Sequence, residues 1–498
     1  MSWIKAIIKI GRNLLKPGKS LSQKVVRSTF WMGAFKVTER TLRFIRTIIV
    51  ARLLSPTDFG LFGLACLAMD ILERFSETGM NAALIQKKEK TEEYLDTAWT
   101  INLIRNIFLF SLLFFGAPFI AKFFNNLSAA PLIRVIAVIM IVRGLTNIGA
   151  VYFIKEFDFR KQFVLRTVGI IVNVVVTLTL AFILRNAWAL VWGYLAQSVA
   201  NCIASYILHP YRPKLQLELP KAKELLNFGK WIFGSSIVIF LATQGDDILV
   251  GKILGIKALG LYTMAFAIAN LVATEITHLI SQVTFPAYSK LQSDTEKLRK
   301  AFFKTLQLIS FITIPIACCI FLFSFDFVNI FLGVKWLPMI PALKILAISG
   351  LIRATTATGG CLFASVGKPE LDFKMNVCRL ITMTIFIYPL TRIYGIEGAS
   401  VTVLLGILST VPVWFYATKK ITNSNFFIYG KSIFPSLIGT FGIVILTLLI
   451  KSSFQINISI FLFTILTLVL VYIGIGVIFV KIFRYGPLKE IKVLMQSI

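Results

Sequence analysis

The sequence contains few charged residues and almost no histidine. Asp, Glu, Lys and Arg make up 15% of its 498 residues, and only two histidines are present. With a mean hydropathy of +0.81, this composition excludes a water-soluble enzyme and a disordered chain. The long apolar runs also exclude a porin-type barrel, whose strands would alternate polar and apolar residues.

Motifs for nucleotide binding, metal binding and catalysis are also missing. Gly18-Lys19-Ser20 lacks the glycine that a phosphate-binding loop requires five residues earlier, where Asn13 stands instead. No HExxH motif occurs, and no outer loop is long enough to form a catalytic domain. The six cysteines lie in apolar stretches without metal-ligand spacing. We therefore expect no catalytic residue, no metal, no disulfide framework and no enzymatic activity.

Apolar residues, in contrast, are abundant. They make up 57% of the chain, close to the share that fourteen spans of about 20 residues would use. Fourteen apolar windows can be drawn, at 28–50, 59–80, 97–120, 131–152, 164–184, 188–208, 228–249, 259–287, 302–324, 338–365, 375–391, 396–417, 432–450 and 457–480. The sequence therefore predicts an all-α polytopic membrane protein with about 14 transmembrane helices.

The basic residues are distributed unevenly between the two sides of these spans. The net charge of +29 would suggest nucleic acid binding in a soluble chain. If the N-terminus is cytoplasmic, however, the cytoplasmic segments carry 32 basic residues and the opposite side carries eight. The positive-inside rule then predicts that both termini are cytoplasmic and that nucleic acid is not a partner. Residues 1–27 form a basic amphipathic segment suited to lie on the anionic leaflet among the membrane lipids.

An internal repeat appears when the chain is shifted by 200 residues. Trp31 then aligns with Trp231, Gly60 with Gly260, and Phe62 with Tyr262. Because six spans is an even number, both copies enter the bilayer in the same direction, as parallel repeats around a central cavity. We predict an N-lobe at 28–208, a cytoplasmic connector at 209–227 and a C-lobe at 228–417, each lobe with six helices. Residues 418–498 add two helices and a basic tail.

The first window carries charges on one face of a helix. Lys36, Glu39, Arg40, Arg43 and Arg46 fall within an arc of about 120°, and the other face is apolar. Four basic residues near the bilayer midplane would cost about 10 to 14 kcal/mol if they faced lipid. The striped face must therefore contact protein or a water-filled cavity, where its cations suit an anionic ligand, particularly a phosphate. Two further cations are assigned to this cationic surface, Arg143 and Arg353.

Acidic residues nearby offer an alternative explanation, in which the cations form structural ion pairs. The candidate counter-charges are Glu39, Asp70, Glu73 and Glu77. They are fewer than the basic residues assigned to the surface, so a net positive charge remains after pairing.

The second half carries a different set of intramembrane charges. These are Asp246, Asp247, Glu275 and His278. Buried carboxylates and a histidine can bind protons or sodium ions, which makes them candidates for ion coupling. A structural salt bridge is the alternative for each of them.

Several segments resemble the Wzx-type oligosaccharide flippases, particularly the branch of colanic acid and teichuronic acid exporters. In the first half they are Ala51-Arg-Leu-Leu-Ser-Pro-Thr-Asp-Phe-Gly-Leu-Phe62 and Thr78-Gly-Met-Asn-Ala-Ala-Leu-Ile-Gln86. In the second half they are the stretch from Gly255 to Asn270 and Phe285-Pro-Ala-Tyr-Ser-Lys-Leu-Gln292. The resemblance covers about residues 20 to 420. It identifies the chain as a member of the multidrug, oligosaccharidyl-lipid and polysaccharide exporter superfamily.

This resemblance implies a function and its partners. Such a protein moves a sugar chain on undecaprenyl pyrophosphate from the cytoplasmic to the outer leaflet of a bacterial cytoplasmic membrane, by alternating access. A proton or sodium gradient would drive it without any other cofactor, and a polysaccharide polymerase and glycosyltransferases would be its protein partners.

Two other functions are compatible with the sequence. A cation-coupled multidrug exporter of the same superfamily would have a cavity dominated by acidic and aromatic residues. A scaffold of a polysaccharide-assembly complex that does not transport would tolerate reversal of the charges at Arg40 and Arg43.

Overall fold

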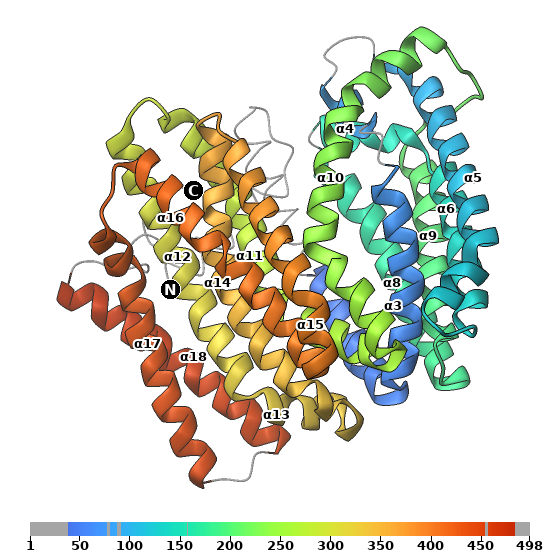
Figure 1. Ribbon diagram of the computed structural model, residues 1–498. Coiled ribbons are helices and arrows are strands. Elements are labelled where there is room, and N and C mark those ends of the chain that lie inside the picture. Colours follow the sequence, from blue (N-terminus) through green and yellow to red (C-terminus); the bar gives the residue numbers. More distant parts are fainter. Residues whose placement is uncertain (1–37, 77–79, 87–90, 157, 454–456, 484–498) are drawn as a thin grey trace, which may run out of the picture. The chain divides into compact units, whose positions relative to one another are not determined.

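The structure is a computed structural model that describes residues 38–76, 80–86, 91–156, 158–453 and 457–483 (Figure 1). The described residues are mostly helical and contain no β-strand. They divide into two compact units, the first ending at Ile237 and the second beginning at Val238. The lobe and connector boundaries taken from the sequence remain predictions.

Unit 1 begins with a helix over residues 38–53. The elements that follow are α3 (Pro56–Arg74), α4 (Met80–Gln86), α5 (Glu92–Phe123), α6 (Ala129–Leu145), η1 (Ile148–Ala150), α7 (Val151–Lys155), α8 (Phe159–Leu184) and α9 (Trp188–Leu208). Helices α8 and α9 pack closely along each other at Gly193. A methyl group added there would lie only 1.8 Å from the Thr177 hydroxyl. Small residues permit this close approach of two helices in a membrane.

The 200-residue repeat aligns the start of α3 with the start of a helix in unit 2, and the residue before each helix explains why it begins there. Ser55 caps α3: its hydroxyl accepts a hydrogen bond from the Asp58 amide at 3.3 Å, and its own amide donates to Asp58 Oδ2 at 2.9 Å. The matching helix begins at Ile256, after Gly255, whose φ of +86° favours glycine. Both helices thus start at positions exactly matched by the 200-residue shift.

Helix α6 is shorter than its predicted window of 131–152. It ends at Leu145, and the chain bends by 72° before η1 and α7. Asn147 stabilises this bend, because its side-chain oxygen accepts from the Gly149 amide at 2.9 Å and its Nδ2 donates to the Tyr211 carbonyl at 2.7 Å. Local capping by asparagine competes with the helix in a way that hydropathy does not report.

The chain that follows α9 is bound along the first turns of α5. The Lys214 amide donates to Asp96 Oδ1 at 2.7 Å, and the Gln216 amide donates to Thr100 Oγ1 at 3.1 Å. The Tyr211 hydroxyl also donates to Asp96. The predicted connector is therefore held against unit 1 by side chains of α5 before the next helix begins at Leu219.

Helix α10 (Leu219–Leu254) begins in unit 1 and ends in unit 2. The other elements of unit 2 are α11 (Ile256–Leu291), α12 (Thr295–Leu322), α13 (Ser324–Phe327), η2 (Val328–Leu332), η3 (Val334–Met339), α14 (Ile340–Ser365), α15 (Glu370–Leu408), α16 (Thr410–Thr422), α17 (Phe426–Ser453) and α18 (Ile458–Phe483). Within this unit α14 packs against α11, α12 and α15.

Helix α15 consists of two arms that fold back on each other. Gly395 breaks the helix with φ +59° and ψ −139°. A methyl group at Gly398 would lie 1.9 Å from the Leu390 carbonyl oxygen, and one at Gly406 would lie 2.7 Å from Met383. The arms correspond to the two windows predicted on either side of residue 395, with α16 extending the second.

The two terminal helices pack against each other, and both contact the rest of unit 2 (Figure 1). Lys451 near the end of α17 pairs with Asp326 at 2.6 Å and donates to the Leu322 carbonyl at 2.7 Å. At the other end, Tyr429 packs against Phe303 and Phe415, with ring centroids 4.8 and 4.9 Å apart. These contacts attach α17 to α12, α13 and α16.

The predicted all-α polytopic membrane protein is confirmed. Among the described residues, six helices are long and apolar enough to cross a bilayer, and the bent pair of α6 with η1 and α7 would be a seventh. Other predicted windows also lie on helices in the described residues: α3, α9 and α10 correspond to three of them, and the apolar stretches Ile256–Asn270 of α11 and Ile458–Tyr472 of α18 are shorter. On α5, Phe115 and Phe119 are 71% and 76% exposed, as expected of side chains that face lipid.

Candidate functional site

The striped face predicted for the first window lies on the helix over residues 38–53. Arg43 pairs with Glu39 at 2.9 Å, and Arg46 donates to the side-chain oxygen of Asn173 on α8. Phe44 and Ile45 are 37% and 47% exposed. The helix therefore directs Arg46 toward α8, while Phe44 and Ile45 on the same helix remain exposed.

The stripe still has unused hydrogen-bonding capacity. The Nε atoms of Arg43 and Arg46 are buried and have no hydrogen-bond partner among the described residues. The two guanidinium groups are also close enough to repel each other. An acceptor with negative charge would relieve both conditions. Arg40 lies on the same helix, one turn before Arg43.

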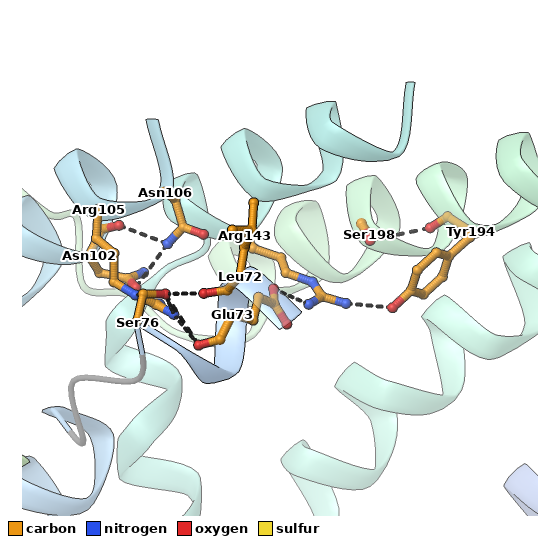
Figure 2. A network of polar contacts seen from close by, with 9 residues as sticks. All are labelled: Leu72, Glu73, Ser76, Asn102, Arg105, Asn106, Arg143, Tyr194 and Ser198. Atoms are coloured by element: carbon orange, nitrogen blue, oxygen red, sulfur yellow. Dashed lines mark hydrogen bonds and ion pairs between the residues drawn. The ribbon is translucent and has the colours of Figure 1, made fainter. Parts of the chain in front are cut away.

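Arg143 on α6 contacts residues from two other helices. It forms an ion pair with Glu73 on α3, and its Nη2 donates to the Tyr194 hydroxyl on α9 at 2.6 Å (Figure 2). The guanidinium carbon also lies 5.8 Å from the centre of the Tyr194 ring. The Arg143 side chain nevertheless remains 36% exposed, so the pairing leaves part of it open to a ligand.

A second arginine, Arg105 on α5, fixes the end of α3. Its Nη2 donates to the Glu73 carbonyl at 3.0 Å and to the Ser76 hydroxyl at 2.8 Å (Figure 2). Cations favour the C-terminal end of a helix, where carbonyl groups lack partners. Arg105 thus has a structural role, and it holds the backbone of the residue that pairs with Arg143.

The predicted charges of unit 1 converge on α3. Cys66 is within electrostatic range of Arg46, Arg143 and Asp70, so these side chains surround one stretch of that helix. Asp70 lies one turn before Glu73 and also interacts with Arg143. The structure thus brings together cations from the helix over 38–53 and from α6 with two of the predicted counter-charges.

The predicted cation Arg353 comes from the second half of the chain. It lies on α14 in unit 2, with its guanidinium carbon 5.8 Å from the centre of the Phe266 ring. The candidate coupling residues Asp246 and Asp247 lie on α10 in the same unit. Asp246 is 1% exposed and accepts a hydrogen bond from the Tyr262 hydroxyl at 2.5 Å.

Four predicted residues cannot be placed. Lys36 and Glu77 lie outside the described residues, and the side chains of Glu275 and His278 on α11 lie outside the described part as well. Their assigned roles remain predictions. In the described part of the chain, no three His, Cys, Asp or Glu side chains are grouped to hold a metal ion.

Several polar residues in these clusters were not predicted. Tyr194 and Asn173 are neutral partners of arginines, and nothing in their local sequence marks them. Arg379 on α15, which is 6% exposed, interacts electrostatically with Asp246. A charge inside the window at 375–391 was the signal that could have identified it.

An apolar groove lies between α8 and α9. Its volume is about 530 Å³, and it is lined by residues such as Val176, Trp192 and Val199. Without charged groups in its lining, it suits a hydrocarbon chain better than an anionic head group.

Comparison with known proteins identifies the family. The sequence profile described as "Polysaccharide biosynthesis protein" matches residues 49–341. The chain is 27% identical over 414 residues to the lipopolysaccharide biosynthesis protein WzxC of Escherichia coli strain K12, covering 82% of this chain and 83% of that protein. It is 23% identical over 423 residues to the teichuronic acid biosynthesis protein TuaB of Bacillus subtilis strain 168, covering 83% and 82%.

The fold is shared with a solved transporter structure. The inward closed conformation of the lipid II flippase MurJ superposes with a TM-score of 0.75 at 16% identity, covering 91% of this chain and 100% of that one. The predicted resemblance to Wzx-type proteins is confirmed by the family match and by these relatives. Because the profile covers more than half of the chain, the protein belongs to the polysaccharide biosynthesis protein family.

Proposed function

We propose that this protein is a flippase for undecaprenyl-pyrophosphate-linked oligosaccharides, moving them from the cytoplasmic to the outer leaflet for cell-surface polysaccharide assembly. The observation that carries the proposal is the convergence of Arg43, Arg46 and Arg143 in unit 1, where the buried Nε atoms of Arg43 and Arg46 have no acceptor among the described residues. Relatives named for lipopolysaccharide and teichuronic acid biosynthesis support the substrate class.

The predicted cationic surface would bind the substrate. The substrate's pyrophosphate or acidic sugars would be held by Lys36, Arg40, Arg43, Arg46, Arg143 and Arg353, because guanidinium groups form paired, charge-assisted hydrogen bonds with phosphate and carboxylate oxygens. Glu39, Asp70, Glu73 and Glu77 would limit the positive charge and position the arginines. Transport would consist of binding and motion of the two lobes, without covalent chemistry, so the protein is not an enzyme.

The driving ion and the cellular setting complete the proposal. Asp246, Asp247, Glu275 and His278 are the candidate sites for coupling to protons or sodium. The excess of basic residues in the predicted cytoplasmic segments supports a bacterial cytoplasmic membrane orientation with both termini inside. A polysaccharide polymerase and glycosyltransferases would act on the product and supply the substrate.

Charge reversal on the striped helix tests this function. The double variant Arg40→Glu, Arg43→Glu should abolish surface polymer and cause lipid-linked repeat units to accumulate on the cytoplasmic side. Arg52→Glu is the matched control, because Arg52 lies on the same helix about 180° from Arg43 and should leave export intact. Normal export by the double variant would instead favour a scaffold, and lowered sensitivity to cationic dyes on expression would favour a drug exporter.

A further inference from the structure

Unit 2 contains a buried cluster of three charged side chains and a tyrosine, contributed by four helices. Asp246 lies on α10, Tyr262 on α11, Arg353 on α14 and Arg379 on α15. Asp246, Tyr262 and Arg379 are 1%, 0% and 6% exposed. Charged groups removed from water to this degree need partners.

The two oxygens of the Asp246 carboxylate differ in their hydrogen bonding. The Tyr262 hydroxyl donates to Asp246 Oδ2 at 2.5 Å, which orients the carboxylate. The other oxygen, Oδ1, is buried and has no hydrogen-bond partner among the described residues. Arg379 is near enough for electrostatic attraction to Asp246, but it forms no hydrogen bond with that free oxygen.

The two arginines of the cluster retain unused donors. Nε and Nη2 of Arg379 and Nη2 of Arg353 are buried and have no acceptor in the described part of the chain. The two guanidinium groups are also close enough to repel each other. Asp247 is the next residue on α10, and its electrostatic interaction is with Asp246 rather than with either arginine.

Asp246 and Asp247 together equal the two arginines in number of charges, but buried donors of both arginines have no acceptor among the described residues. Burying a guanidinium group in this state is unfavourable unless an acceptor arrives. A phosphate or a carboxylate would be a suitable acceptor, because its oxygens can accept hydrogen bonds from several N–H groups. Its negative charge would also weaken the repulsion between the two guanidinium groups.

We propose that Arg379 and Arg353 form an anion-binding subsite in unit 2 for a phosphate or carboxylate of the transported glycolipid, with Asp246, held by Tyr262, as the resident counter-ion. This proposal rests on the proposed function and assigns unit 2 its own contact with the substrate. The anion could be the diphosphate of the lipid carrier or the carboxylate of an acidic sugar, and both would use the same donors.

A structural role for Arg379 makes a different prediction. If Arg379 only neutralises Asp246, removing both charges together should restore every property of the protein. If Arg379 also binds the substrate, Asp246→Asn with Arg379→Gln should restore stability without restoring ligand binding. The double variant therefore separates the two roles, and Arg392→Gln on the same helix is a matched control with an exposed arginine.

The experiment uses the purified full chain in lipid nanodiscs. Binding is measured for undecaprenyl diphosphate, for undecaprenol, which lacks phosphate, and for a soluble uronic acid oligosaccharide. We expect the double variant to unfold at nearly the wild-type temperature and to bind one anionic probe about tenfold more weakly. Weaker binding of undecaprenyl diphosphate identifies the lipid phosphate as the anion, and weaker binding of the oligosaccharide identifies the sugar carboxylate.

Other outcomes overturn the proposal. If the double variant binds both anionic probes as the wild type does, the subsite is wrong but the proposed function stands. If the wild type binds neither anionic probe better than undecaprenol, the subsite and the proposed function both fail. Should the double variant not fold, Arg353→Gln provides the same comparison from the less buried arginine, and unchanged binding there also refutes the subsite.

Discussion

Arg143 and Glu73 form an ion pair that joins α6 to α3, and Tyr194 on α9 accepts a hydrogen bond from the same guanidinium group. Three helices of unit 1 thus meet at one arginine. Arg143 was expected to bind substrate and Glu73 to balance its charge, so this pair is where structural and ligand-binding roles can be separated.

Exchanging the charges of this pair should preserve stability and abolish export. Glu73→Gln alone should lower the free energy of unfolding by about 1 to 2 kcal/mol, because it leaves a partly buried guanidinium group without its counter-ion. Combining Glu73→Arg with Arg143→Glu should recover much of that loss. Chemical denaturation measures stability, and surface polymer measures export. Full export by the exchanged variant would show that Arg143 acts only as a structural partner.

The fold-back of α15 should not tolerate a side chain at Gly398. Alanine there would place its methyl group 1.9 Å from the Leu390 carbonyl oxygen, so the two arms must separate. We expect a loss of about 2 kcal/mol or more, measured as a lower unfolding temperature. Gly430→Ala on α17 is the control, because no atom lies within 4 Å of the added methyl group. Equal stability of the two variants would contradict the packing of the arms.

The contact between Asp96 and the connector should protect the connector from proteases. Asp96 accepts from the Lys214 amide and from the Tyr211 hydroxyl. Asp96→Ala should remove both contacts, cost about 1 to 3 kcal/mol, and expose the bond after Lys214 to trypsin. Asp96→Asn keeps an acceptor and should be cleaved more slowly than Asp96→Ala. If trypsin cleaves the two variants and the wild type equally fast, Asp96 does not hold the connector.

Acid should loosen the start of the connector through His209. Burial lowers the pKa of His209, and the charge of Lys161 lowers this pKa further. His209 Nδ1 accepts from the Tyr211 amide at 3.2 Å, and its ring stacks on Tyr152 with centroids 5.7 Å apart. Protonation of Nδ1 would end that hydrogen bond.

Because the pKa is lower in the folded than in the unfolded chain, stability is fully present above the usual histidine pKa of about 6.5. It is lost as the pH falls through the folded value. Amide hydrogen exchange at Tyr211, corrected for its intrinsic pH dependence, should lose protection over that range. His209→Asn retains an acceptor without the titration and should abolish the pH dependence. Persistence of the same dependence in this variant would assign it to another group.

The repeat illustrates what local sequence can predict. The shift of 200 residues correctly places the starts of α3 and α11, because capping by Ser55 and the positive φ of Gly255 are local properties. Within the described residues, the apolar windows likewise lie largely on helices, since the hydropathy of a span depends on its own residues. Even the end of α6 at Leu145 had a local cause in Asn147, although hydropathy alone does not reveal it.

The sequence does not predict the interaction partners of the buried charges. The shift aligns Arg46 with Asp246, yet Arg46 contacts a neutral asparagine on α8, whereas Asp246 contacts Tyr262 and is attracted to Arg379 on α15. Helical periodicity predicts which face of a helix carries a charge. It does not predict which helix is packed against that face.

The amino-acid sequence by itself determined that this is a polytopic helical membrane protein with an internal repeat and with cations on one face of a helix. Hydropathy and helical periodicity depend only on the residues of each segment, so they can be read without the tertiary structure. Only the tertiary structure decided which arginines are neutralised and which keep unused donors. The ion pairs Arg143–Glu73 and Lys451–Asp326 join helices that are distant in sequence, so their formation depends on how those helices pack.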